Sequence, residues 1–195
     1  SLRFALAETL MATQVDAPEL SVVIPLLNEE EVLEQTYASL TKHLDVLGIS
    51  YELVFVDDGS TDRSRAILAA KSLLDARVRV VALSRNFGHE MATTAGIHHA
   101  RGRAVVIIDA DLQDPPEVIA EFVAKWREGY QVVYGVRRER KGETLLKKAT
   151  SFLFYRLMSR IADTKIPKDT GDFRLIDRRV IDVYSKLSED PRFFR

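Results

Sequence analysis

Short apolar runs alternate with amphipathic stretches along the first two thirds of the chain. The short runs are rich in β-branched residues and bounded by polar turns, which is typical of buried strands; they cover residues 20–27, 51–56, 78–83, 104–108 and 131–134. The stretches between them have helical spacing and cover residues 29–47, 61–74, 89–100 and 115–128. This alternation predicts an α/β fold, in which helices cover both faces of a mostly parallel central sheet.

The pattern changes after residue 136. Residues 137–142 (RRERKG) are a basic loop, and residues 143–162 follow with apolar side chains such as Leu146 and Leu153 at helical spacing. Aromatic and basic side chains border this apolar face, so the predicted helix has the composition of one that lies in a membrane interface. The same pattern also fits a helix that packs on the sheet or on another subunit.

Composition and charge narrow the class of protein. Hydrophobic residues make up 46% of the 195 residues and charged residues 29%, and the absence of cysteine excludes a disulfide framework, a thiolate metal site and a thiol nucleophile. Residues 1–136 hold 12 Lys and Arg against 20 Asp and Glu, whereas residues 137–195 hold 16 against 9. The positive second part fits an anionic partner such as a phosphate or an acidic membrane surface, although ordinary solvated faces produce the same pattern.

The strongest candidate site directly follows the run at residues 104–108, in the sequence DADLQ. Ligands of an open parallel sheet bind beyond the carboxyl ends of its strands, where Asp109 and Asp111 are expected. Two carboxylates spaced i, i+2 on a turn can converge on one Mg²⁺ or Mn²⁺ ion, and Gln113 adds a neutral oxygen. The alternative is that Asp111 or Asp114 caps the helix that follows.

Two further acidic loops are expected at the same edge of the sheet. Asp57 and Asp58 follow the run at residues 51–56, and Glu29 lies in the loop that follows the first strand. Asp58 can accept a hydrogen bond from a nucleotide base, whereas the alternative is turn chemistry and capping of the next helix. A metal and nucleotide site requires acidic loops gathered at one edge, whereas stability alone does not.

Phosphate groups would have to be bound without a glycine-rich loop, because the chain has neither a P-loop nor a GxGxxG sequence. Residues 84–88 (SRNFG) precede a predicted helix and can offer its N-terminus to a phosphate. His89, His98 and His99 lack metal-ligand spacing and are interpreted as structural or surface residues.

Asp172 and Arg174 lie two residues apart in the sequence GDFRL. On an extended strand both side chains would lie on one face. They either pair with each other as a structural salt bridge or point into the cleft as an orienting carboxylate and a phosphate clamp. The sequence leaves both interpretations open.

Five motifs together resemble the family 2 glycosyltransferases, which have the Rossmann-like GT-A fold: IPLLNEE, VDDGSTD, SRNFGHE, IDADLQDPPE and TGDFRL. More narrowly, they are similar to the polyprenyl-phosphate glycosyltransferases, the dolichyl-phosphate mannose synthase and bacterial undecaprenyl-phosphate glucosyltransferase type. The similarity covers about residues 20–195. It implies an inverting, metal-dependent enzyme that moves a sugar from a nucleotide-sugar, favouring a UDP-sugar over GDP-mannose, to a polyprenyl phosphate.

The resemblance also implies roles for individual residues. Those matching nucleotide-sugar contacts are Pro25, Glu29, Asp58 and Asp109. Those matching ligands of Mg²⁺ or Mn²⁺ are Asp109, Asp111 and Gln113. Those falling where relatives bind the acceptor phosphate are Arg137, Lys147 and Ser151. The catalytic set is Asp172, Asp111, Arg137 and Arg174.

We therefore expect three parts: an extension over residues 1–19, a nucleotide-sugar and metal-binding half over 20–136, and an acceptor-binding half over 137–195. The resemblance implies a homo-oligomer at the cytoplasmic face of the cell membrane, without a nucleic acid partner. Relatives commonly carry membrane helices after this domain, so we expect a chain truncated before them. The alternatives are a soluble family 2 transferase acting on a saccharide hydroxyl and a non-catalytic module that binds a nucleotide-sugar.

Overall fold

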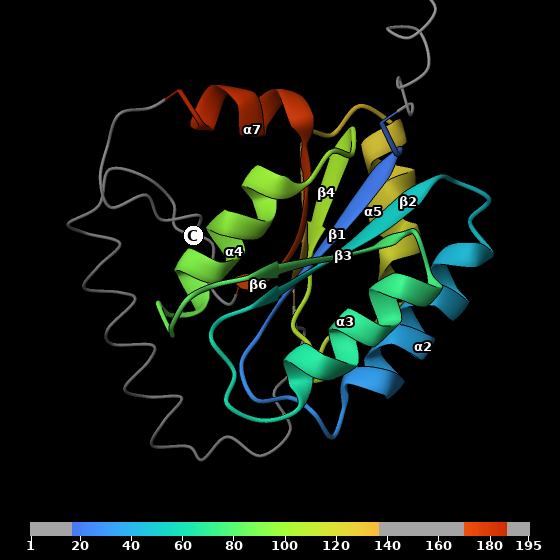
Figure 1. Cartoon of the computed structure of the whole chain (residues 1–195). Helices are drawn as coiled ribbons and strands as arrows, with labels where there is room; N and C mark the ends of the chain where they lie inside the picture. The colour runs from blue at the N-terminus through green and yellow to red at the C-terminus, as the bar shows by residue number, and fades with distance from the viewer. Residues whose placement is uncertain (1–16, 137–169, 187–195) are drawn as a thin grey trace, which may run out of the picture.

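A computed structural model of the chain describes residues 17–136 and 170–186 (Figure 1). Three sequence-based expectations lie outside these residues. They are the basic loop at 137–142, the amphipathic helix at 143–162 and most of the extension at 1–19.

Six strands form one sheet in the order β3-β2-β1-β4-β6-β5. Their bounds are β1 (Leu20–Leu26), β2 (Tyr51–Asp57), β3 (Val78–Ala82), β4 (Ala104–Ile107), β5 (Val132–Val136) and β6 (Thr170–Asp177). The strands β3, β2, β1 and β4 run parallel to their neighbours, whereas β6 is antiparallel to both β4 and β5. The prediction of a mostly parallel sheet is confirmed.

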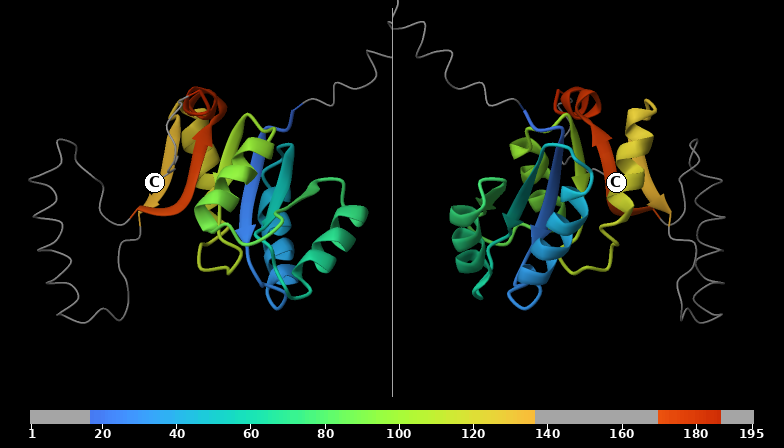
Figure 2. Two further views of the ribbon diagram at one scale, coloured as in Figure 1. Left: turned by 60° about the vertical axis from the view of Figure 1, so that its left-hand side comes forward. Right: turned by 90° about the vertical axis from the view of Figure 1, so that its right-hand side faces the viewer.

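In the described part of the chain, five helices flank the sheet in two layers. Their bounds are α2 (Leu33–Asp45), α3 (Ser64–Leu74), α4 (His89–His99), α5 (Val118–Arg127) and α7 (Arg178–Tyr184). Side chains of α2, α3 and α5 pack on one face of the sheet, and those of α4 and α7 pack on the other (Figures 1 and 2). The four helices expected between residues 29 and 128 are present, each within the predicted range, whereas the helix expected at 143–162 lies outside the described residues.

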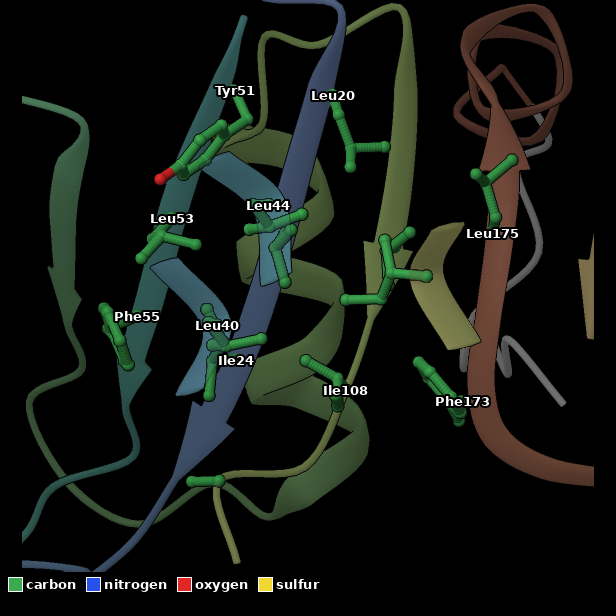
Figure 3. Packing of buried hydrophobic residues seen from close by; sticks show 14 of the residues in the cluster. Leu20, Ile24, Leu40, Leu44, Tyr51, Leu53, Phe55, Ile108, Phe173 and Leu175 are labelled. Carbon is green, nitrogen blue, oxygen red and sulfur yellow. The ribbon is translucent and has the colours of Figure 1, made fainter. Parts of the chain in front are cut away.

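The two faces of the sheet are both buried, which explains why the strands consist of nearly continuous apolar runs. Alternate residues of a strand point to opposite faces, so Ile24 of β1 packs with α2 while the neighbouring Val23 packs under α4. Figure 3 shows Ile24 and Phe55 of the sheet beside Leu40 of α2. Each fully buried side chain of this kind stabilises the fold by about 1.5–3 kcal/mol.

The antiparallel strand β6 brings its amino end to the carboxyl ends of the parallel strands. Ile107 of β4 pairs with Arg174 of β6. Continuing this antiparallel register by two residues puts Asp109 opposite Asp172. A strand from the second half of the chain is thus inserted between β4 and β5, directly beside the acidic loops.

Candidate functional site

A cavity of about 320 Å³ lies at the carboxyl edge of the sheet. It is formed by the loops that follow β1, β2, β3 and β4 and by the first turn of α4. Its polar lining consists of Glu29, Asp58, Asn86, His89, Asp109 and Asp111. Pro25 lines it as well, so all four residues matched to the nucleotide-sugar surround a single cavity.

The loops after β1 and β2 are joined by hydrogen bonds that fix Glu29. The Asn28 side chain accepts from Thr61 N at 2.8 Å, and Asn28 N donates to Ser60 Oγ at 2.9 Å. Glu29 N itself donates to Ser64 Oγ at 3.0 Å. Burial raises the pKa of Glu29, and the nearby carboxylates, chiefly Asp111, raise it further. The Glu29 carboxyl is therefore partly buried, with other carboxylates nearby.

Asp58 links the loops after β2 and β3. Its buried carboxylate accepts from Phe87 N through Oδ1 and from Gly88 N through Oδ2, both at 2.8 Å. The neighbouring Asp57 takes the turn role, accepting from Ser60 N at 2.9 Å. Asp58 thus shapes the cavity by fixing the backbone that enters α4, an interaction that neither sequence interpretation anticipated.

The DADLQ loop brings two carboxylates to the cavity in different environments. Asp109 Oδ1 is buried and makes no hydrogen bond within the described residues. Burial raises the pKa of Asp109, and neighbouring carboxylates add to the rise while His89 opposes it. Asp111 is exposed, and its Oδ1 accepts from Gln113 N at 3.0 Å. The Gln113 side chain is exposed and does not line the cavity.

The N-cap residue of α5 is Glu117, and its side chain makes no capping hydrogen bond. The Asp111 carboxylate accepts from Gln113 N within its own loop, so Asp111 is not the N-cap residue of this helix. The capping role of Asp114 stays a prediction. Within residues 17–136 and 170–186, however, no group of three His, Cys, Asp or Glu side chains is arranged to hold a metal by itself.

His89 is the site residue that the sequence interpretation missed. Its Nε2 lies 3.6 Å from Asp109 Oδ1 and 3.5 Å from Asp172 Oδ2, between the two carboxylates. The hydrogen bond with Asp172 raises the pKa of His89, although burial opposes the shift. The sequence signal that could have identified His89 is its position directly after the loop at residues 84–88, which is expected at the carboxyl ends of the strands. The sequence interpretation tested His89 only for the spacing of a metal ligand, and it does not have that spacing.

Asp172 and Arg174 combine the two interpretations that the sequence left open. Arg174 Nη2 lies 3.2 Å from Asp172 Oδ1, so the two residues pair with each other. Asp172 Oδ2 nevertheless reaches His89 at the cavity. The pair is therefore both a salt bridge within β6 and a neighbour of the acidic loops.

The remaining predicted site residues lie outside the described residues, namely Arg137, Lys147 and Ser151. Among the residues that the structure describes, no helix combines the length and apolar character needed to cross a bilayer. The expected membrane contact and acceptor-phosphate site stay predictions.

The sequence matches the model of the glycosyl transferase family 2 over residues 21–185. The uncharacterized glycosyltransferase YkcC of Bacillus subtilis (strain 168) is 55% identical over 175 residues, which cover 90% of this chain and 54% of YkcC. The bactoprenol glucosyl transferase of Shigella phage SfV is 38% identical over 177 residues, covering 91% of this chain and 58% of the phage protein. The chain thus spans a little over half the length of these relatives.

Solved structures show the same fold. The mannosyltransferase PcManGT from Pyrobaculum calidifontis, in complex with GDP-Man and Mn²⁺, has a TM-score of 0.58 at 21% identity, covering 93% of this chain and 53% of PcManGT. The glucosyl-3-phosphoglycerate synthase of Mycobacterium tuberculosis, in complex with Mn²⁺, UDP-glucose and phosphoglyceric acid, has a TM-score of 0.61 at 23% identity, covering 84% of this chain and 57% of the synthase. The expected GT-A fold is confirmed.

Proposed function

The chain belongs to glycosyl transferase family 2, and we propose that it moves a sugar from a nucleotide-sugar to a polyprenyl phosphate with inversion at the anomeric carbon. The observation that carries this proposal is the single cavity lined by Glu29, Asp58, Asp109 and Asp111, with Asp172 at its border through His89. The proposed lipid acceptor is supported by the 38% identity to a bactoprenol glucosyl transferase.

The donor would occupy the cavity. Pro25, Glu29 and Asp58 would contact the nucleotide, and Asp109 would lie near the diphosphate. A UDP-sugar is the favoured donor, with GDP-mannose as the second choice. Because the proposed acceptor is a lipid, the reaction would take place at a membrane surface; the cytoplasmic face and a homo-oligomer stay predictions.

A divalent cation fits the residues of the DADLQ loop. Asp109 offers a buried carboxylate oxygen that makes no hydrogen bond in the described part of the chain, and Asp111 adds a second, exposed carboxylate to the same cavity. Mg²⁺ and Mn²⁺ accept such a two-carboxylate site because they share their remaining ligands with substrate phosphates and water. When bound, either ion would neutralise charge on the diphosphate leaving group.

The transfer itself demands little proton chemistry from the protein. An oxygen of the acceptor phosphate forms the new bond to the anomeric carbon, and the bond to the donor diphosphate breaks, its electron pair leaving with the nucleotide. A phosphate monoester is already ionised near pH 7, so no strong general base is needed. We propose that Asp172 orients reacting groups and that Arg174, with Arg137, Lys147 and Ser151, positions phosphate by charge-assisted hydrogen bonds.

The test is a panel of UDP- and GDP-sugars incubated with undecaprenyl phosphate in Mn²⁺, Mg²⁺ or EDTA. We expect a lipid-linked sugar that forms with metal, disappears in EDTA and is lost in Asp111→Ala. The exposed α7 variant Asp182→Asn is the matched control and should keep full turnover. Equal product in EDTA and in metal would contradict the role of Asp109 and Asp111.

Two other results would favour the alternatives. Turnover only with a saccharide acceptor would identify a transferase that acts on a hydroxyl group. Calorimetric binding of nucleotide-sugar without product from any acceptor would indicate a binding module.

A further inference from the structure

His89 lies between two carboxylates of the site, and the proposed function assigns it no role. Its ring lies between Asp109, in the loop after β4, and Asp172, near the start of β6, with Nε2 at 3.6 and 3.5 Å from their carboxylate oxygens. These two carboxylates come from parts of the chain about 60 residues apart, and they face each other only because β6 pairs with β4. His89 approaches both from the helix layer that covers this face of the sheet.

We infer that His89 is a positioning residue of the transfer reaction, which holds the Asp172 carboxylate in a fixed orientation beside Asp109. This inference rests on the proposed function, because it assigns Asp172 to the acceptor side and Asp109 to the donor side. His89 also lines the cavity proposed for the donor, but the role inferred here acts through Asp172. It would set the geometry between the donor-side and the acceptor-side carboxylates.

The backbone that carries His89 is fixed on its amino-terminal side. Gly88, the preceding residue, donates to the buried Asp58 carboxylate at 2.8 Å, and Phe87 N donates to the other oxygen of that carboxylate. The first turn of α4 closes on Gly88 O, which accepts from Met91 N and Ala92 N at 3.0 Å. The ring therefore starts from an anchored main chain, and a group on such a rigid element can position a neighbour precisely.

The contacts to Asp172 fall on different oxygens. His89 lies next to Oδ2, and Arg174 Nη2 lies 3.2 Å from Oδ1. A carboxylate with a donor at each oxygen is restrained against rotation about its side-chain torsions. Loss of the His89 contact would remove the restraint that this α4 residue places on Oδ2, while the Arg174 contact on Oδ1 remains. A displacement of about 1 Å at a reacting group can reduce the rate about 100-fold.

The kinetic test compares His89→Ala and His89→Gln with the control His98→Ala, an exposed histidine on the same helix. We expect kcat to fall about 10- to 100-fold in His89→Ala with the KM for the donor changed less than about threefold. The Gln variant keeps an N–H donor and should recover part of kcat, and His98→Ala should match the wild type. A wild-type kcat in His89→Ala, or a loss confined to KM, would overturn the inference.

A second measurement tests the contact without turnover. The chain has four histidines, so the side-chain nitrogen resonances of ¹⁵N-histidine-labelled chain can be assigned by the loss of one set in His89→Gln. We expect Asp172→Asn to shift the His89 resonances, whereas Asp182→Asn on α7 leaves them unchanged. Resonances of His89 that do not respond to Asp172→Asn would overturn the inference.

The two measurements separate this inference from the proposed function. If the wild-type chain transfers no sugar to a lipid phosphate, the proposed acceptor is wrong, and the kinetic comparison is repeated with the acceptor that does support turnover. If transfer occurs and the His89 variants behave like His98→Ala, the result supports the proposed function and contradicts the positioning role of His89.

Discussion

At Gly59 the loop after β2 passes close to the backbone of the loop after β3. The φ of Gly59 is +78°, and a Cβ added there would lie 2.5 Å from the carbonyl carbon of Arg85. Only glycine satisfies both conditions, because it tolerates positive φ and has no side chain. The DDGS turn thereby allows residues 85–88 to pass directly beside Asp58.

We predict that Gly59→Ala lowers the free energy of unfolding by more than about 2 kcal/mol and weakens nucleotide binding, because the backbone at Arg85 must move. The control is Gly48→Ala, since Gly48 has a φ of +62° but nothing within 4 Å of an added Cβ. The unfolding free energy of Gly48→Ala should fall by only about 1 kcal/mol, which is the cost of placing alanine at a positive φ. Urea unfolding and calorimetry with UDP and Mn²⁺ measure both effects. Equal losses in the two variants would argue against the close approach.

Asp58 provides a second prediction at the residue scale. Its two oxygens accept from Phe87 N and Gly88 N, so Asp58→Asn presents an amide NH₂ to one of these donors. We expect a loss of about 1–3 kcal/mol in unfolding free energy and weaker binding of UDP with Mn²⁺. Asp182→Asn, on the surface of α7, should change neither quantity. Unchanged stability together with weaker binding would instead indicate an Asp58 that serves the nucleotide alone.

Individual residues of the site were predictable to different degrees. Asp109 and Asp111 follow an unmistakable buried strand, so their edge of the sheet could be predicted from sequence. The sequence placed His89 directly after a loop at this edge, but not between two carboxylates, because these neighbours, at 3.5 and 3.6 Å, come from the loop after β4 and from β6. The sequence suggested that Asp58 belongs to a turn or binds a base. Its actual partners, Phe87 N and Gly88 N, could not be inferred because they belong to a different loop.

At the scale of elements, β6 is the strand that completes the site. Its sequence alternates between the two faces, with Phe173 and Leu175 packed against the α5 side and Asp172 and Arg174 on the other. The Phe173 ring packs against the Phe122 ring of α5 at an interplanar angle of 45°, with ring centroids 4.7 Å apart. A short alternating run of this kind shows that a segment is extended, but it does not reveal that its partner is β4 or that the pairing is antiparallel.

The end of β6 is tied to α5 and α7 through Asp177. Asp177 Oδ2 accepts from Trp126 Nε1 at 2.7 Å, and Oδ1 accepts from Arg179 N at 2.8 Å and Arg179 Nε at 2.9 Å. The Arg179 side chain is the main cause that lowers the pKa of Asp177 to about 2, with Trp126 contributing. One carboxylate therefore caps α7 and joins it to the opposite helix layer.

The depressed pKa of Asp177 predicts a specific dependence of stability on pH. An unfolded aspartate has a pKa of about 3.9, so the stabilisation is complete above that pH and is lost as the pH falls toward 2. Asp177→Asn should cost about 1–2 kcal/mol at pH 7, and the difference from wild type should shrink between about pH 4 and pH 2. The fluorescence of Trp126, the only tryptophan, reports urea unfolding. A difference that is the same at pH 7 and pH 3 would contradict this link.

At the scale of the whole molecule, the carboxyl and amino ends of the parallel strands contribute to different properties. The carboxyl ends form the site, and the amino ends stabilise the fold. The carboxyl edge carries the cavity, whereas the amino edge carries a buried network around Glu52 that joins β1, β2 and the loop before β4. Glu52 accepts from Ser21 Oγ and Arg101 N at 2.7 Å, and from Arg101 Nη2 at 2.9 Å. Gly102 N also donates to Ser21 Oγ at 2.8 Å. The network holds three parallel segments in register at the end of the sheet away from the cavity.

We therefore predict that Glu52→Gln separates stability from function. Loss of the carboxylate at this buried position should lower the unfolding free energy by about 1.5–3 kcal/mol, because an amide cannot accept at both of its heteroatoms from Ser21, Arg101 and Arg79. Nucleotide affinity and kcat at a temperature where the variant is folded should stay within about twofold of wild type. The exposed Glu121→Gln on α5 is the control. A loss of activity in folded Glu52→Gln would show that the two edges are coupled.

The sequence by itself determined the α/β class, the four parallel strands with their helices, and the edge at which Asp58, Asp109 and Asp111 gather. These features are local, since hydrophobic period, turn residues and the position of a carboxylate after a strand can be read within about ten residues. Only the tertiary structure decided that β6 lies antiparallel between β4 and β5, and that His89 lies between Asp109 and Asp172. Those contacts join residues distant in the chain, and packing of the two helix layers on one sheet selects them.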